Sequence, residues 1–210
     1  AQALSLQEEL DRVMPVLYAL RDYNIPLSID TYKPVVMREA ILAGVDMVND
    51  IHGFSLAGAV EAVASSEVGL CIMHMQNTPK TMQEQPEYEN IQAEVLAYLR
   101  ERVHAFSGAG VAAKRMCIDP GFGFGKSLEH NISLVQQVAY FQEQLGLPLL
   151  AGVSRKTMLG AITGREVGQR QAASIAAALA LTSRGARILR VHDVVETCDA
   201  LKVWNTLALG

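Results

Sequence analysis

The stretch DPGFGFGKS at residues 119–127 contains residue types that can bind a phosphate group. A nucleotide-binding P-loop has the pattern G-x-x-x-x-G-K-[ST], and its first glycine would have to lie at position 120. That position is Pro120, so the pattern fails where the backbone amides must turn toward the phosphate. The stretch therefore argues against a nucleotide site, and it leaves Asp119 as the residue whose chemistry needs an explanation.

Cationic side chains follow two later apolar runs. The first run ends in Ser154, Arg155 and Lys156, and the second is followed by Arg190 and His192. Arg190 and His192 are two positions apart, so on a strand their side chains emerge from the same face. An arginine supplies a forked donor and a histidine a switchable one, and together they suit a phosphate or a diphosphate.

Carboxylate and amide groups end three other apolar runs, at Asp30, Asn49 and Asp119. Asp30 and Asn49 could instead cap the helices that follow them, and the residues alone leave that alternative open. A carboxylate accepts two parallel N–H bonds, so Asp119 could bind a flat heterocycle with amidine-like N–H groups. An anionic leaving group on that heterocycle would meet the cations, and Phe122 and Phe124 could cover an aromatic second substrate.

A metal site is the alternative use for His74 and His192, with Asp30 and Asp119 as further ligands. Metal hydrolases of the barrel kind depend on a paired H-x-H, and the five histidines of this chain contain no such pair. A lone histidine is more often a hydrogen-bonding or core residue than a ligand. We therefore expect no metal ligands in this chain.

The elements that must position these residues alternate between short apolar runs and segments of helical period. This alternation is typical of β/α units around a parallel sheet. The expected strands lie at 26–31, 45–50, 68–75, 115–120, 148–154 and 186–193. The expected helices lie at about 33–43, 56–65, 87–107, 128–145, 166–184 and 194–208, with one more at about 5–22 ahead of the first strand.

The polar residues collect at the ends of the six expected strands. In (β/α)₈ barrels the active site is built at this C-terminal rim of the strands. A closed barrel has eight strands, and this chain opens on a helix with no strand before it. We expect one domain over residues 1–210, an α/β (β/α)₈ TIM barrel that lacks its first two strands and first helix. An open, doubly wound sheet is the alternative.

Composition argues against several classes of protein. The net charge is −4 and basic residues are scattered singly, which is unlike a nucleic-acid-binding surface. No apolar run approaches the ~18 residues that span a bilayer, and the first residues are not signal-like. The three cysteines are widely spaced and indicate neither a disulfide framework nor a zinc knuckle. We expect a soluble, cytoplasmic enzyme that binds neither nucleic acid nor membrane.

Six motifs together carry a resemblance to a known family. They are, in chain order, IDTYKP, VND, MHMQNTPKTMQ, DPGFGFGKS, GVSRKTMLG and RVHDV. Their order and spacing resemble dihydropteroate synthase, the folate-pathway enzyme family inhibited by sulfonamides. One small departure is Asn77, where relatives often carry glycine, and we expect it to affect only the local loop.

The resemblance implies a reaction and a set of site residues. The family joins 4-aminobenzoate to 6-hydroxymethyl-7,8-dihydropterin diphosphate in an SN1-like displacement, with Mg²⁺ on the leaving diphosphate, and it tips the expectation toward a homodimer. By motif position, the pterin would be held by Asp30, Asn49, Asp119 and Lys156 and lined by Ile51, Met73 and Gly152. Phe124, Ser154 and Lys156 would approach the aminobenzoate, and Arg190 and His192 would hold the diphosphate.

Two alternatives stay beside this interpretation. The family's first two strand-end loops, of Asn-x-Thr-Pro-Asp-Ser and Ser-Thr-Arg-Pro type, have no counterpart in this sequence. The chain could therefore be a catalytically incomplete pterin-binding fragment. It could also be the pterin-binding barrel of a methyltetrahydrofolate methyltransferase, which the cationic diphosphate clamp disfavours because methyl transfer has no use for it.

Overall fold

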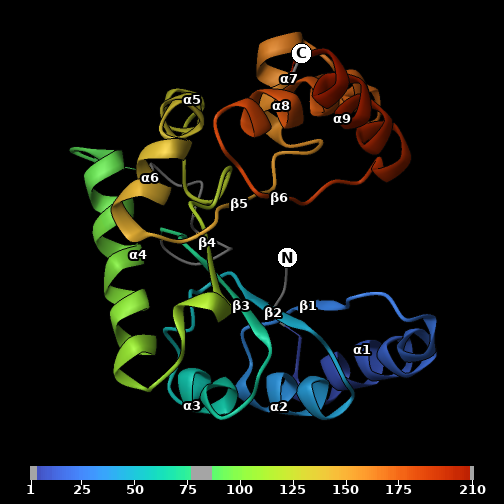
Figure 1. The fold of residues 1–210 in the computed structure, drawn as a ribbon, viewed down its shortest axis with the longest axis vertical. Coiled ribbons are helices and arrows are strands. Elements are labelled where there is room, and N and C mark those ends of the chain that lie inside the picture. Colours follow the sequence, from blue (N-terminus) through green and yellow to red (C-terminus); the bar gives the residue numbers. More distant parts are fainter. Residues whose placement is uncertain (1–3, 77–86, 209–210) are drawn as a thin grey trace.

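The computed structural model describes residues 4–76 and 87–208, in which helices alternate with short strands (Figure 1). The strands are β1 (Ser28–Asp30), β2 (Met47–Asp50), β3 (Gly69–Met73), β4 (Met116–Asp119), β5 (Leu150–Ala151) and β6 (Ile188–Leu189). The helices are α1 (Leu6–Leu20), α2 (Pro34–Leu42), α3 (Ala59–Ala64), α4 (Ile91–Gly108), α5 (Leu128–Gln136), α6 (Val138–Leu145), α7 (Thr157–Thr163), α8 (Gln171–Ser183) and α9 (Val194–Ala208). Short 3₁₀ turns lie at η1 (Arg21–Tyr23), η2 (Ala113–Arg115) and η3 (Val167–Gln169).

The six strands pair in parallel and in chain order. β1 to β4 form one sheet, β5 pairs with β6, and a parallel bridge from Ile118 to Leu149 joins the two groups. A doubly wound sheet would instead reverse its strand order at a switch point. Figure 1 shows the helices following one another in chain order around the strands. This is the arrangement of consecutive β/α units in a barrel.

The expected strands are confirmed, but three helices differ from expectation. The helix predicted over 128–145 is two helices, α5 and α6, because Gln137 between them has φ −106° and ψ 15°. The helix predicted from 166 begins at Gln171, after the η3 turn. The seven-residue helix α7 was not predicted, since two turns are too short for a helical period to stand out.

The inner faces of β3 and β4 lead directly to the rim. Cys71 and Cys117 are register partners, and they are buried together in a small cluster with Leu150. Side chains alternate along a strand, so Met73 and Asp119, two residues further on, share this inner face at the strand ends. On each strand, the residue between the cysteine and the rim residue belongs to the larger core that packs under the helices. Both cysteines are free and buried, so they act as small core residues.

The glycine loop, residues 121–125, lies directly against the end of β3. The backbone N–H of His74 donates to the carbonyl of Asp119 (2.9 Å). Gly121 has φ +72°, and a Cβ added there would lie 1.8 Å from the carbonyl oxygen of His74. Phe122 is fully buried and anchors the loop in the core. Only glycine at position 121 allows this contact.

No helix within residues 4–76 and 87–208 combines the length and apolar character needed to cross a bilayer.

Replacing Gly121 with alanine should destabilise the protein far more than the same change at Gly110. Both glycines have positive φ (+72° and +80°), but no atom lies within 4 Å of a Cβ at Gly110. Left-handed backbone alone costs alanine roughly 1 kcal/mol, and the clash at Gly121 should bring the total above about 3 kcal/mol. Urea unfolding followed by circular dichroism measures both. Equal losses in the two variants would contradict the close packing of the glycine loop on β3.

Candidate active site

Every predicted site residue lies at or just beyond the C-terminal end of a strand. These residues are Asp30 on β1, Asn49 and Ile51 at β2, Met73 on β3, Asp119 on β4, Phe124 in the glycine loop, Gly152, Ser154 and Lys156 after β5, and Arg190 and His192 after β6. Parallel strands in register end at one edge, which brings these side chains to a common rim. Asn77 lies outside the described residues.

Asn49 presents an unpaired acceptor at this rim. It is 5% exposed, and its Nδ2 donates to Oδ2 of Asp30 (2.9 Å). Its Oδ1 is buried and has no hydrogen-bond partner among the described residues. A buried acceptor without a donor costs free energy and is rare in native structures. A ligand N–H is therefore the natural partner for Oδ1.

Asp50, the next residue, has a structural task. Its two carboxylate oxygens accept the backbone N–H groups of His52 (2.8 Å) and Phe54 (2.9 Å). Burial raises the pKa of Asp50 to about 7, against the effect of these two hydrogen bonds. The carboxylate closes the turn after β2 and leaves Asn49 to face the rim.

Asp119 is a buried carboxylate close to cations. It is 2% exposed and accepts the backbone N–H of Gly121 (2.7 Å). Burial raises the pKa of Asp119, while Lys156 and Arg190 act in the opposite direction. A carboxylate held here gains from any further N–H donors that a ligand brings.

A cavity of about 290 Å³ lies between the ends of β5 and β6, lined by Gly152, Ser154, Lys156, Arg190, Val191 and His192. Arg190 pairs with Asp30 at 2.6 Å, and both side chains are nearly half exposed (43% and 46%). Such a pair contributes little net free energy, so an anion can replace Asp30 at low cost. Ser154 Oγ accepts the backbone N–H of His192 (3.2 Å) and lies 2.9 Å from its Nδ1.

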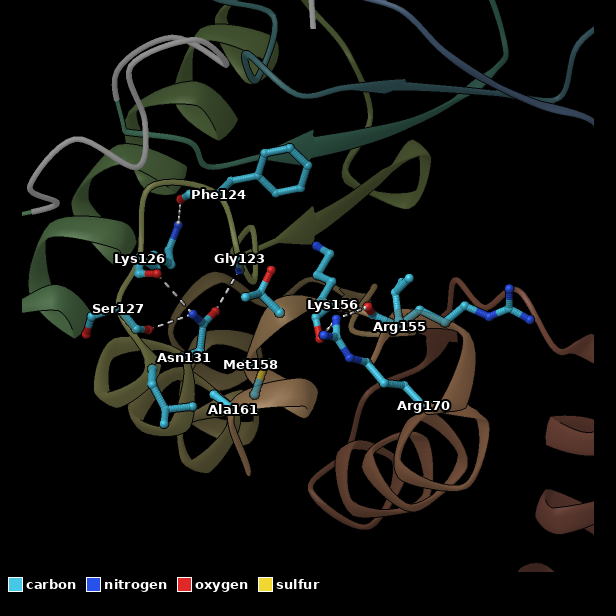
Figure 2. Close-up of a pocket in the computed structure, with 13 residues that line it drawn as sticks. Gly123, Phe124, Lys126, Ser127, Asn131, Arg155, Lys156, Met158, Ala161 and Arg170 are labelled. Atoms are coloured by element: carbon cyan, nitrogen blue, oxygen red, sulfur yellow. Dashed lines mark hydrogen bonds between the residues drawn. The ribbon is translucent and has the colours of Figure 1, made fainter. Parts of the chain in front are cut away.

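A larger cavity of about 640 Å³ opens on the other side of Lys156, between the glycine loop and helices α5 and α7 (Figure 2). Lys156 Nζ lies 4.5 Å from the centre of the Phe124 ring and donates to the carbonyl of Phe122. Burial lowers the pKa of Lys156 to about 8. Among the described residues, Lys156 is thus the predicted site residue common to the linings of both cavities.

Arg170 and Asn131 line this larger cavity, and sequence reasoning missed both. Arg170 donates to the carbonyls of Arg155 (3.0 Å) and Lys156 (3.4 Å) and so braces the turn before α7. Asn131 accepts the backbone N–H of Gly123 (2.7 Å) and donates to the carbonyl of Ser127 (2.7 Å). Neither residue follows a strand, so a search for polar residues at the ends of strands does not identify them.

Ser154 and Phe124 line different cavities. Ser154 lines the smaller cavity beside His192, and it is absent from the lining of the larger one. The prediction that Ser154 approaches the aminobenzoate stays a prediction. Its hydrogen bonds instead join it to His192.

Comparison with known proteins identifies the family. A family model described as pterin binding enzyme matches residues 1–192. Dihydropteroate synthase of Neisseria meningitidis serogroup C is 45% identical, with 100% of this chain and 75% of that protein covered. The Haemophilus influenzae dihydropteroate synthase is 46% identical, with 99% and 76% covered.

Solved structures agree. The dihydropteroate synthase of Stenotrophomonas maltophilia superposes with a TM-score of 0.95 at 49% identity, covering 98% of this chain and 78% of that one. The Burkholderia cenocepacia enzyme complexed with 7,8-dihydropteroate gives 0.92 at 48%, covering 100% and 77%. The Yersinia pestis enzyme in a sulfonamide drug complex gives 0.96 at 39%, covering 100% and 76%. The barrel class and the family predicted from the motifs are both confirmed, and the chain belongs to the pterin-binding enzyme family, among the dihydropteroate synthases.

Proposed function

We propose that this protein condenses 6-hydroxymethyl-7,8-dihydropterin diphosphate with 4-aminobenzoate, giving dihydropteroate and diphosphate. The observation that carries the proposal is the pair of buried acceptors, Asn49 Oδ1 and Asp119, beside a cationic cavity. The related Burkholderia enzyme binds 7,8-dihydropteroate and the Yersinia enzyme a sulfonamide drug, which supports the same ligands here.

The pterin would lie against Asp119 and Asn49. Asp119 would accept the parallel N–H groups of the pterin edge, and Asn49 Oδ1 would accept a further ring N–H. Asp30, which holds Asn49, and Lys156 would complete the polar contacts. Ile51, Met73 and Gly152 would line the slot. At Gly152 an added Cβ would lie 3.3 Å from Arg190 Nε, so a larger residue would press on the diphosphate side.

The diphosphate would enter the smaller cavity. Arg190 and His192 would bind the oxygens of the departing diphosphate. Arg190 would then give up its exposed ion pair with Asp30. Ser154 would orient His192 through its hydrogen bonds. Positive charge fixed at this point stabilises the departing diphosphate, while the carboxylate of Asp119 stabilises the methylene cation that forms on the pterin.

The aminobenzoate would occupy the larger cavity, against the Phe124 ring and Lys156. An aromatic ring packs on Phe124, and the amine would then face the pterin methylene across Lys156. Attack by this amine replaces the lost diphosphate and needs no covalent enzyme intermediate. Sulfonamides, which carry a similar arylamine, would compete for this cavity.

The test combines binding and turnover. The pterin diphosphate is titrated into the protein by calorimetry, and diphosphate release is then assayed after addition of 4-aminobenzoate. Release that depends on both substrates supports the proposal. Binding without release supports the pterin-binding fragment instead. Pterin binding that inorganic diphosphate does not weaken favours the methyltransferase alternative, which needs no diphosphate clamp.

Replacing Asp119 with asparagine should abolish pterin binding. Asparagine offers one acceptor and a donor where the carboxylate offers two acceptors, so one pterin N–H meets another N–H. We expect the dissociation constant to rise about 100-fold or more in calorimetry, since hydrogen bonds to a charged group contribute roughly 1.5–3 kcal/mol each. Asp22→Asn, at a side chain that is 84% exposed, is the control. An unchanged pterin affinity in Asp119→Asn would refute the assigned role.

We also propose that Mg²⁺ accompanies the diphosphate. The described residues contain no group of three or more His, Cys, Asp or Glu side chains that could hold a metal. Mg²⁺ is commonly held by substrate phosphates together with few protein ligands. Removing Mg²⁺ with a chelator should therefore lower diphosphate release by at least about tenfold and leave binding of the diphosphate-free pterin unchanged. Equal release with and without chelator would contradict this.

We further propose a cytoplasmic homodimer. Helices α8 and α9 present an apolar groove of about 580 Å³ that includes Leu179, Val203, Trp204 and Leu207, and Leu207 is 78% exposed. Exposed apolar patches of this kind mark interfaces, and a second copy would cover them. The three free cysteines suit a reducing compartment, and cell fractionation would show whether the protein is found there.

Val203→Glu should dissociate the homodimer, because it places a charge in the apolar groove. Sedimentation velocity should then show the monomer, while the control Val16→Glu, at a similarly exposed position on α1, stays dimeric. A wild-type protein that sediments as a monomer at all concentrations would rule the homodimer out.

A further inference from the structure

Lys126 is a buried lysine that the proposed reaction does not use. It is 4% exposed, and it belongs to none of the ion pairs within 4.0 Å that the described residues form. Its Nζ donates to the carbonyl of Phe124 (2.9 Å) and lies 3.1 Å from Nδ1 of His74 (Figure 2 shows the first contact). Burial lowers the pKa of Lys126 to about 7; the charge of Asp119 acts in the opposite direction, and Lys156 adds to the effect of burial. Burying an amine costs free energy, so a lysine at this position calls for a functional explanation.

His74 is a fixed acceptor for this amine. It follows β3, is 6% exposed, and stacks edge-on against Tyr98 at 5.0 Å. The hydroxyl of Tyr98 donates to the carbonyl of His52 (2.7 Å), which holds the ring pair in place. Burial and the neighbouring Lys126 lower the pKa of His74 to about 3, so the imidazole is neutral at neutral pH. A neutral ring whose proton is on Nε2 can accept the Lys126 hydrogen bond at Nδ1.

The two contacts of Lys126 tie the glycine loop to the barrel at one point. Phe122 is buried in the core, but Phe124 is only partly buried and is one of the residues that line the larger cavity. The Phe124 carbonyl is held by Lys126, and its ring is in contact with the Lys156 ammonium. The bond from Lys126 therefore fixes the residue that faces the aminobenzoate.

We propose that Lys126 and His74 are positioning residues for the second substrate. They hold Phe124, and through it Lys156, where the ring and amine of the aminobenzoate must lie relative to the pterin methylene. This inference rests on the proposed function. Lys126 also lines the larger cavity, and the role assigned to it is its contact with Phe124. The hydrogen bonds of Asn49 and Asp119 are to Asp30 and Gly121, and Lys126 acts on Asp119 only through its charge, which opposes the rise that burial causes in the pKa of that carboxyl.

The first test replaces Lys126 with methionine, which keeps the length of the stem and removes the donor. We expect the KM for 4-aminobenzoate to rise about tenfold or more, and kcat to fall, because small displacements of positioning groups are costly in catalysis. The dissociation constant of the pterin diphosphate should change less than about threefold. Lys114→Met, at an exposed lysine of η2, is the matched control and should change neither value.

The second test replaces His74, the hydrogen-bond partner of Lys126. Asparagine at position 74 places an acceptor near the position of Nδ1, whereas leucine does not. His74→Asn should keep most of the wild-type KM for 4-aminobenzoate, and His74→Leu should reproduce the defect of Lys126→Met. The double variant Lys126→Met with His74→Leu should be no worse than either single variant, because the two residues act through one contact. Additive losses would mean that they act separately.

The outcomes separate this inference from the function on which it rests. A wild-type protein that releases no diphosphate overturns both. An active wild type with an unchanged aminobenzoate KM in Lys126→Met, or with equal losses for both substrates, overturns the positioning role alone. Circular dichroism checks folding, and if Lys126→Met does not fold, the difference between His74→Asn and His74→Leu decides the question.

Discussion

In-register parallel pairing from β1 to β4 places Asp30 beside Asn49 and Met73 beside Asp119, at the ends of neighbouring strands. A shift of one residue in the strand pairing would remove these side chains from the rim, because such a shift turns every side chain of the strand to the opposite face. The buried cysteines and Leu150 fill the interior beneath and hold that register. The site is thus a consequence of strand register, and the loops add cations and aromatic rings to an edge that is already set.

The electrostatics of this edge are those of a site built to receive a ligand. Asp119 and Lys126 are buried and Lys156 is partly buried, and burial disfavours the charged form of each. Asn49 adds an acceptor with no donor among the described residues. Buried polar groups cost free energy unless they are paired, and in the proposed reaction Asn49, Asp119 and Lys156 would gain partners from a pterin carrying an anionic leaving group. Preorganised polar groups of this kind supply much of the rate enhancement in many enzymes.

Much of the fold was visible in the sequence because β/α alternation repeats along the chain and polar residues end or follow each strand. The strand positions and the common rim follow from that rule, while the substrate assignments came from the motif resemblance. Helix α7 and the break at Gln137 were missed because they are local and short. Lys126 and His74 are 52 positions apart, and the periodicity of apolar residues does not predict a contact between such distant positions. The place of Ser154 beside His192 likewise depends on how β5 and β6 align.

A crystal structure of the protein with the pterin diphosphate bound would show directly whether the rim binds the pterin. We expect a pterin N–H within about 3 Å of Asn49 Oδ1, a pair of N–H groups on Asp119, and the diphosphate between Arg190 and His192 in place of the Asp30 ion pair. A pterin bound elsewhere, or bound at the rim with Asn49 Oδ1 still lacking a donor, would contradict the proposed site.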